Sequence, residues 1–127
     1  MGVLLMPKSK IVSTGGYLPK KVLTNDDLSK MVDTSDEWIV SRTGIKERHI
    51  IAPDEHCSDM CFEAAKRALD QANVKPDQID MLIVATMSGD QKLPGASFLL
   101  QKKLGIKCAA VFDISAACSG FVYALSM

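Results

Sequence analysis

The sequence predicts an α/β fold in which strands alternate with helices and parallel strands are joined by helical crossovers. Three observations support this prediction. Residues 81–85 form a continuous apolar run, which is typical of a parallel strand buried on both faces. Residues 59–71 place their apolar side chains at helical spacing. Residues 108–112 form a second apolar strand pattern that leads into a largely apolar helix pattern starting at Phe121.

The other elements follow from turn and cap residues. Residues 11–19 predict a strand that ends in a turn, because Gly15, Gly16 and Pro19 interrupt the pattern. The remaining expected elements of the first half are a short helix from Thr24, its N-cap, to about Val32, a helix that begins after Thr34 or Ser35 and ends at Gly44, and an extended segment 46–51. The second half of the chain is expected to contain the helix 59–71 capped by Ser58, a turn at Pro76–Asp77, a polar loop 89–92, and a helix from Pro94 to Leu104 that ends at Gly105.

Size and charge limit the possible functions. The 127 residues carry 15 basic and 15 acidic side chains, which argues against a nucleic acid or an anionic membrane surface as the main partner. No apolar run approaches the length of about 20 residues that a membrane span needs. We therefore expect a cytoplasmic protein whose four cysteines are reduced thiols.

The chain predicts one domain, residues 10–127, preceded by an extension of residues 1–9. Neither an internal repeat nor a low-complexity linker divides it. Met127 falls about two turns into the last predicted helix without a C-cap signal, so we expect the chain to stop within that helix.

Cys118 is the strongest candidate for a catalytic residue. It lies between a strand pattern and a helix pattern, and small residues, Ala116 and Gly120, stand two positions before and after it. Serine hydrolases expose their nucleophile on a strand-to-helix turn by the same steric principle. Free N–H groups and the positive end of the helix dipole would favour the thiolate, which is the nucleophilic form. The alternative is an inert buried cysteine, since free Cys is among the most buried residue types.

The other cysteines and the two histidines predict no second centre. Cys57 and Cys61 are four residues apart, but no second pair follows at the spacing of a zinc site, so we expect no metal. We expect Cys61 and Cys108 to pack in the core. His49 and His56 are expected to have structural or solvated roles, and Lys46, Arg48 and Lys92 to be solvated charges.

Three segments in order resemble β-ketoacyl-acyl-carrier-protein synthase III, a thiolase-fold condensing enzyme family that initiates type II fatty-acid synthesis. The segments are Lys10 to Pro19, Thr34 to Arg48 (TSDEWIVSRTGIKER) and Asp113 to Leu125 (DISAACSGFVYAL). The resemblance implies a thiolase-like layered α-β-α fold, of which this chain would be most of the first of two related halves. It also implies a homodimer that transfers an acyl group, acetyl above all, from acyl-coenzyme A to Cys118. Decarboxylative condensation with malonyl-acyl-carrier protein would follow, with no metal or redox cofactor.

The resemblance also assigns site residues. Cys118 matches the nucleophile, while the family's catalytic His and Asn would lie beyond Met127. Trp38 and Arg42 match residues that contact the adenine nucleotide of coenzyme A, and Thr34 matches a residue near that site. Leu93 matches a position that reaches across a dimer interface into the partner's acyl pocket; many bacterial members carry Phe there, so Leu93 implies room for a larger or branched primer.

Each assignment has an alternative. Trp38 and Arg42 are one turn apart and would share a helix face, which fits an adenine platform but also simple surface packing. Leu93 can be read as an ordinary loop hydrophobe. The whole chain can also be read as another thiolase-fold acyl-transfer or condensing enzyme, or as an inactive fragment that only binds or assembles with another chain.

Overall fold

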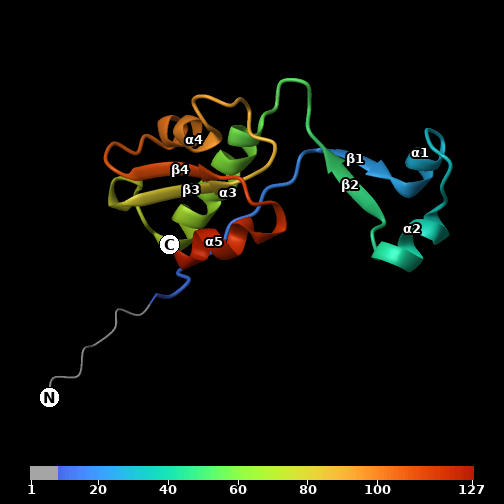
Figure 1. Ribbon diagram of the computed structural model, residues 1–127, viewed down its shortest axis with the longest axis horizontal. Coiled ribbons are helices and arrows are strands. Elements are labelled where there is room, and N and C mark those ends of the chain that lie inside the picture. The colour runs from blue at the N-terminus through green and yellow to red at the C-terminus, as the bar shows by residue number, and fades with distance from the viewer. Residues whose placement is uncertain (1–8) are drawn as a thin grey trace, which may run out of the picture.

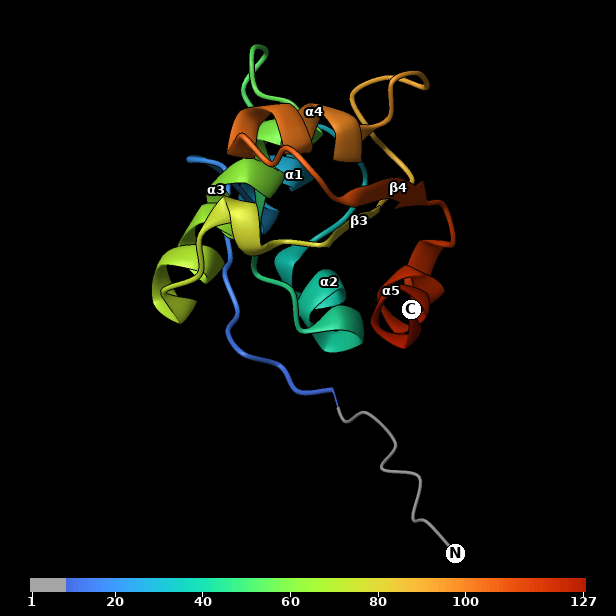
Figure 2. The same ribbon diagram turned by 90° about the vertical axis from the view of Figure 1, so that its left-hand side faces the viewer.

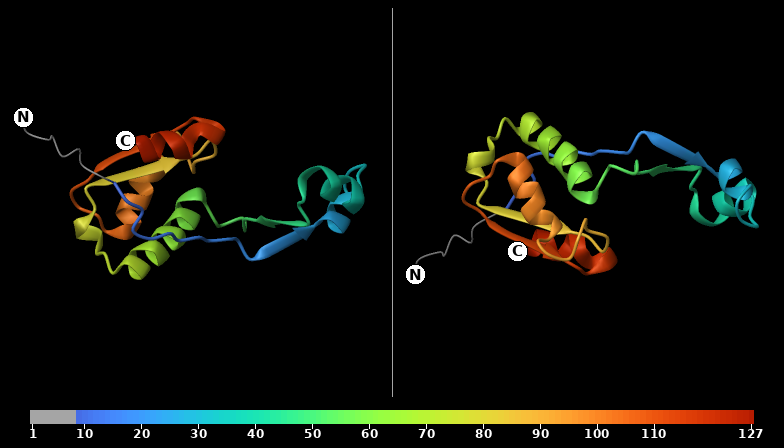
Figure 3. Two further views of the ribbon diagram at one scale, coloured as in Figure 1. Left: turned by 90° about the horizontal axis from the view of Figure 1, so that it is seen from below. Right: turned by 90° about the horizontal axis from the view of Figure 1, so that it is seen from above.

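The computed structural model describes residues 9–127, so eight of the nine residues of the expected extension lie outside the described residues. Two regions are distinct in Figure 1: a layered body (residues 57–126) and an arm (residues 21–50) that projects from it. The views in Figure 3 show the same separation from below and from above, with two connecting segments running between the regions.

The body is built on two parallel strands, β3 (Met81–Ala85) and β4 (Ala110–Ile114), joined by helix α4 (Ala96–Leu104). Helices α3 (Cys57–Ala72) and α4 lie on one face of this pair, and α5 (Gly120–Ser126) lies on the other (Figure 2). Two short 3-10 helices, η1 (Pro76–Gln78) and η2 (Ala117–Ser119), precede β3 and α5. The predicted α/β crossover is confirmed.

The core of the body lies between the strands and the α3–α4 layer. Val84, Ala96 and Leu100 are buried there, and Phe62 and Cys61 of α3 pack against them. Burial is one-sided, however: Met81 at the start of β3 is 46% exposed. Residues 81–85 form the predicted strand, in which Val84 is buried and α5 covers the second face in part.

The arm consists of an antiparallel strand pair and two short helices. Its elements are β1 (Lys21–Thr24), α1 (Asn25–Ser29), α2 (Asp36–Thr43) and β2 (Glu47–Ile50). The Thr24 and Ser35 hydroxyls accept backbone N–H groups and cap α1 and α2. Thr24 is the predicted cap of α1, and Ser35 is one of the two predicted start positions of α2. Gly44 ends α2 at φ 71°, which is also as predicted, whereas α1 ends at Ser29 rather than near Val32.

A buried polar side chain holds the arm together. Asn25 is 1% exposed, and its Nδ2 donates to Asp36 Oδ1 (2.7 Å) and to the Ile45 carbonyl (2.8 Å). Arg48 donates to Asn25 Oδ1 (2.6 Å) and to the Leu23 carbonyl (3.1 Å). The expectation that Arg48 is a solvated charge is wrong, because its guanidinium links β2 to β1 and α1.

Three further expectations are corrected. Residues 11–19 form no strand; this segment lies along α3, where the Ser13 hydroxyl donates to the Ala68 carbonyl (2.7 Å). The second body strand begins at Ala110, two residues later than expected, which leaves Cys108 exposed in a bend outside the core. Residue 56, not Ser58, occupies the N-cap of α3, and Ser58 is a fully buried residue of its first turn.

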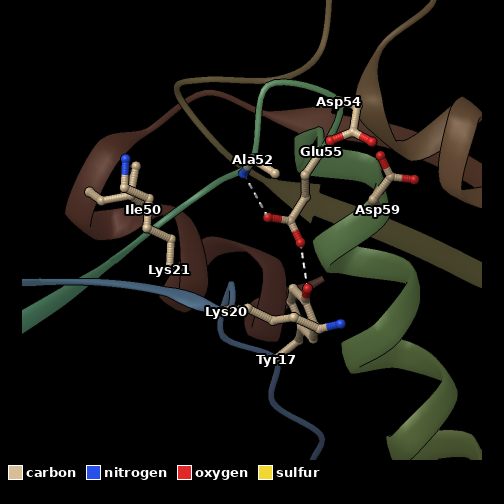
Figure 4. Close-up of a pocket in the computed structure, with 8 residues that line it drawn as sticks. All are labelled: Tyr17, Lys20, Lys21, Ile50, Ala52, Asp54, Glu55 and Asp59. Atoms are coloured by element: carbon tan, nitrogen blue, oxygen red, sulfur yellow. Dashed lines mark hydrogen bonds between the residues drawn. The ribbon is translucent and has the colours of Figure 1, made fainter.

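The two connecting segments meet at a cavity of about 430 Å³ between arm and body (Figure 4). Glu55 lies between them: the Tyr17 hydroxyl donates to Glu55 Oε1, and the Ala52 N–H donates to Glu55 Oε2 (3.2 Å). The Glu55 carboxylate raises the pKa of Tyr17 through this hydrogen bond. Arg67 of α3 lies 5.5 Å from the Tyr17 ring centroid and donates to the Gly16 carbonyl, which attaches the first connector to the body.

Over residues 9–127, the structure contains no helix with the length and apolar character needed to cross a bilayer.

Candidate active site

Cys118 lies on a strand-to-helix turn, as predicted. The chain leaves β4 at Ile114, forms η2 around Cys118 and enters α5 at Gly120. Cys118 is exposed in this chain, whereas the alternative reading expects a buried cysteine. The side chain is accessible to a substrate at the carboxyl end of the parallel strand pair.

The turn is tight on both sides of the cysteine. Ala117, directly before Cys118, has φ 44°, a left-handed conformation that costs a residue with a Cβ about 1–3 kcal/mol unless its surroundings impose it. A Cβ on Gly120 would lie 3.0 Å from the Ala85 Cβ. The missing side chain of Gly120 therefore allows α5 to approach β3 closely.

The surface around Cys118 is apolar. A cavity of about 580 Å³ lies between β3 and α5, and it is lined by Ile83, Ala85, Ala117, Cys118, Phe121, Ala124 and Leu125. Phe121 is 69% exposed and Leu125 is 61% exposed. The thiol therefore opens onto carbon side chains, which suit an uncharged acyl group better than a charged substrate.

Trp38 and Arg42 share one face of α2, as their spacing predicts. The Arg42 guanidinium carbon lies 4.4 Å from the centroid of the Trp38 ring, a cation–π distance. Trp38 is 52% exposed, so the indole has an accessible surface. Thr34 lies beside it, because Thr34 and Trp38 line one cavity of about 450 Å³ together with Asp33 and Ser35.

The structure does not bring all the predicted site residues together. Trp38 and Cys118 line different cavities, one on the arm and one on the body. Leu93 lines neither of these cavities, lies in the loop between β3 and α4 and is 88% exposed. The expected nucleophile and the expected coenzyme A residues are thus on separate parts of the chain.

Cys61, His49 and His56 have contacts of their own elsewhere in the structure. Cys61 packs against the core, as predicted, and burial raises its pKa to about 12, so it stays a protonated thiol at neutral pH. The His49 ring nitrogen Nδ1 contacts the Pro19 carbonyl (2.5 Å), and the backbone N–H of His56 donates to Asp59 Oδ2 (3.0 Å). Among residues 9–127, no group of three or more His, Cys, Asp or Glu side chains is placed to hold a metal ion.

Two acidic residues that bind the first turns of helices were not singled out from the sequence. Asp90 accepts the backbone N–H (2.8 Å) and the hydroxyl (2.6 Å) of Ser58 at the start of α3. Asp113 accepts the N–H groups of Ala96 and Ser97 at the start of α4, both at 2.8 Å. The sequence contained a partial sign of these contacts, because Asp90 follows the predicted strand 81–85 and Asp113 lies at the end of the second predicted strand. Helix N-termini lie near the carboxyl ends of parallel strands in an α/β fold.

Comparison with known proteins extends these observations. No family model matches the chain. β-Ketoacyl-[acyl-carrier-protein] synthase III of Escherichia coli strain K12 is 57% identical over 119 residues, which cover 94% of this chain and 38% of the relative. The crystal structure of 3-oxoacyl-[acyl-carrier-protein] synthase III from Aquifex aeolicus VF5 superposes with a TM-score of 0.88 at 54% identity, covering 92% of this chain and 38% of that one.

A third similar protein belongs to a polyketide biosynthetic pathway. The priming β-ketosynthase of the R1128 polyketide biosynthetic pathway also superposes with a TM-score of 0.88, at 39% identity, covering 92% of this chain and 35% of that one. The chain therefore spans little more than a third of the length of the curated relatives that it matches. Over that span it has a thiolase-like condensing-enzyme fold, and it is a homologue of the N-terminal portion of β-ketoacyl-[acyl-carrier-protein] synthase III.

Proposed function

We propose that the protein containing this chain is a condensing enzyme that initiates type II fatty-acid synthesis, with Cys118 as its nucleophile. The observation that carries the proposal is the position of Cys118: an exposed thiol on a tight strand-to-helix turn that opens onto an apolar cavity. The 57% identity to an Escherichia coli β-ketoacyl-[acyl-carrier-protein] synthase III supports it.

The reaction has two covalent steps. The Cys118 thiolate attacks the thioester carbonyl of acetyl-coenzyme A, the carbon–sulfur bond to coenzyme A breaks, and the acetyl group stays on Sγ. The Cys118 backbone N–H is the expected donor to the oxyanion of this step. Malonyl-acyl-carrier protein then loses CO2, and its nucleophilic carbon attacks the acetyl-Cys carbonyl, which releases the thiolate and the β-ketoacyl product.

Trp38, Arg42 and Thr34 are proposed to bind coenzyme A. The exposed indole supplies a flat surface for the adenine ring, and the guanidinium already stacked on it supplies positive charge for phosphate groups. The cavity that Thr34 shares with Trp38 supports a contact of the Thr34 hydroxyl with the same ligand.

Leu93 is proposed to line the acyl pocket of a partner subunit in a homodimer. Its 88% exposure on a loop supports a contact outside this chain rather than a role in its own core. In sedimentation measurements on the full-length protein, Leu93→Glu should shift the dimer toward monomer, whereas the exposed control Lys102→Glu should not. Equal sedimentation of both variants and the wild type would contradict the interface.

Residues 1–127 alone are proposed to be inactive in condensation. The resemblance implies that the family's catalytic His and Asn would lie beyond Met127. In addition, Phe121, Val122 and Leu125 present an apolar surface that favours association. A purified 1–127 chain that is monodisperse and condenses acetyl-coenzyme A with malonyl-acyl-carrier protein would show that this proposal is wrong.

The decisive experiment is acylation of the full-length protein with radiolabelled acetyl-coenzyme A. Cys118→Ala should abolish the label, while Cys57→Ala, Cys61→Ala and Cys108→Ala should retain it. Label that persists in Cys118→Ala would exclude Cys118 as the nucleophile.

A second candidate function is priming in a polyketide pathway. It rests on the R1128 priming β-ketosynthase, whose TM-score equals that of the Aquifex aeolicus enzyme although its identity is lower. The two functions differ in the carrier protein that accepts the condensation product. Higher turnover with the fatty-acid carrier protein than with a polyketide carrier protein would support the first function, and the reverse would support the second.

A further inference from the structure

Two acidic side chains, one in the loop after β3 and one on β4, accept backbone N–H groups from the first turns of helices that are distant from them in sequence. Asp90 does so for α3 and Asp113 for α4, although neither belongs to the helix that it caps. The positions directly before the two helices, His56 and Gly95, supply no side-chain cap to the free N–H groups of the first turn. Both helices therefore depend on side chains from the strand edge.

Asp113 has the more informative position, because it lies on β4 five residues before Cys118. Its Oδ2 accepts the Ala96 N–H and its Oδ1 accepts the Ser97 N–H, so both oxygens are fixed. Residue 95 is shaped for this contact: a Cβ on Gly95 would lie 2.1 Å from Asp113 Oδ2, too close to coexist with it.

We propose that Asp113 is a positioning residue for the Cys118 nucleophile: by binding the start of α4, its carboxylate fixes the end of β4 from which the Cys118 turn departs. This inference rests on the proposed function of Cys118.

The turn is held between two anchors. On one side, Asp113 binds α4, and the next residue, Ile114, accepts the Thr86 N–H (3.0 Å) from the end of β3. On the other side, Gly120 packs closely against Ala85. The left-handed Ala117 lies between these anchors, and a conformation of this kind persists only where the surroundings impose it. Without the Asp113 anchor, the turn can relax and point the thiol elsewhere.

The test compares single-turnover acylation of the full-length protein by acetyl-coenzyme A in four variants: Asp113→Asn, Gly95→Ala, their combination and the control Asp80→Asn. Asp80 is a matched control because it lies at the opposite end of the same sheet and contacts Ala110 through its backbone carbonyl. We expect Asp113→Asn to lower the maximal acylation rate about 10- to 100-fold, the scale of a misplaced reactive group. The half-saturating acetyl-coenzyme A concentration should not change, because its expected binding residues lie on the arm.

Gly95→Ala should reproduce this effect from the other side of the contact, and the double variant should be no slower than either single variant. A purely stabilising role would instead leave the maximal rate of the folded variants at the wild-type value. That result, or losses that add in the double variant, would overturn the proposal; hydrogen exchange in α4 identifies which variants are folded.

Alkylation of Cys118 by iodoacetamide separates this inference from the proposed function, because it needs no coenzyme A. If the wild type is not acylated, the proposed function is wrong, and slower alkylation in Asp113→Asn and Gly95→Ala than in Asp80→Asn still supports positioning. Alkylation at one rate in all variants would overturn it.

Discussion

The body and the arm are stabilised in different ways. The body closes around apolar side chains, Val84, Ala96 and Leu100, packed between parallel strands and two helices. The arm is organised around the buried side-chain amide of Asn25. Its nitrogen donates to α2 and to the loop before β2, and its oxygen accepts from Arg48 of β2. The body is thus stabilised mainly by the burial of apolar side chains, whereas the arm is stabilised mainly by directional hydrogen bonds.

This difference parallels the proposed division of labour. The nucleophile needs a fixed direction, and Cys118 follows a strand of the closely packed region. Trp38 and Arg42, which are proposed to bind a large substrate, lie on the region with little apolar core, where only Ile39 is a buried hydrophobic side chain among residues 21–50. Regions with few buried apolar contacts open at lower free energy, so we expect the arm to be the more mobile one.

Truncation of a core side chain should have the largest effect and should be confined to the body. Leu100 is 3% exposed, and Leu100→Ala should lower the free energy of unfolding by about 2–5 kcal/mol. Hydrogen exchange followed by mass spectrometry should speed up in α4 and β3 and not in α1 or β2. Lys102→Ala, on the exposed side of α4, is the control; equal acceleration in both regions would show that they do not differ as described.

Asn25→Ala should destabilise the arm and leave the body unchanged, the opposite of Leu100→Ala. The substitution removes the hydrogen bonds of Asn25 with Asp36 and Arg48, which should cost about 1.5–3 kcal/mol because both partners are charged. Exchange should accelerate in β1, α1 and β2, while labelling of Cys118 by iodoacetamide keeps its rate. Slower alkylation would mean that arm and body are tightly coupled.

Trp38→Ala should affect substrate binding rather than folding. Loss of base stacking is worth about 1–3 kcal/mol, by analogy with nucleic-acid binders, so the Michaelis constant for acetyl-coenzyme A should rise about 5- to 150-fold. The constant for malonyl-acyl-carrier protein should change less. Trp38→Phe keeps an aromatic face and should lose less than Trp38→Ala; an unchanged constant in both would assign Trp38 to surface packing.

Local signals predicted much of the fold and the site. The strand at residues 81–85, the cap Thr24 and the terminating Gly44 each depend on neighbours in sequence, and each lies where the sequence predicts it. The Cys118 turn was predictable for the same reason, since the strand pattern, the small residues and the helix pattern are contiguous. So was the shared face of Trp38 and Arg42, which follows from a separation of four residues on one helix.

The expectations that failed depend on contacts distant in sequence. Residues 11–19 have a strand pattern, but their position along α3 decides their conformation. The roles of Asn25, Arg48 and Asp113 come from partners 11 to 25 residues away, and no pattern within one element identifies such partners. Cys108 looked like a core residue because apolar neighbours follow it, yet the strand begins two residues later.

The smallest expected effect concerns Asp27, on the exposed surface of α1. Its hydrogen bonds with Thr24, and then that with Lys30, lower the pKa of Asp27 from 3.8 to about 2. A carboxylate with a lowered pKa in the folded state stabilises that state fully above its unfolded pKa. This contribution should disappear as the pH falls from about 4 toward 2.

Carbon NMR titration of the Asp27 carboxyl group measures this pKa directly. Thr24→Ala should raise it more than Lys30→Ala does, because the Thr24 hydroxyl is the larger cause. Asp26, the adjacent acid in the first turn of α1, is the internal reference in the same spectra. If Lys30→Ala raises the pKa of Asp27 more than Thr24→Ala does, the charge of Lys30 rather than the capping hydroxyl is the larger cause of the lowered pKa. If Thr24→Ala does, the arm depends on directional hydrogen bonds at its surface as well as at Asn25, because a capping hydroxyl contributes only while the first turn of α1 keeps its geometry.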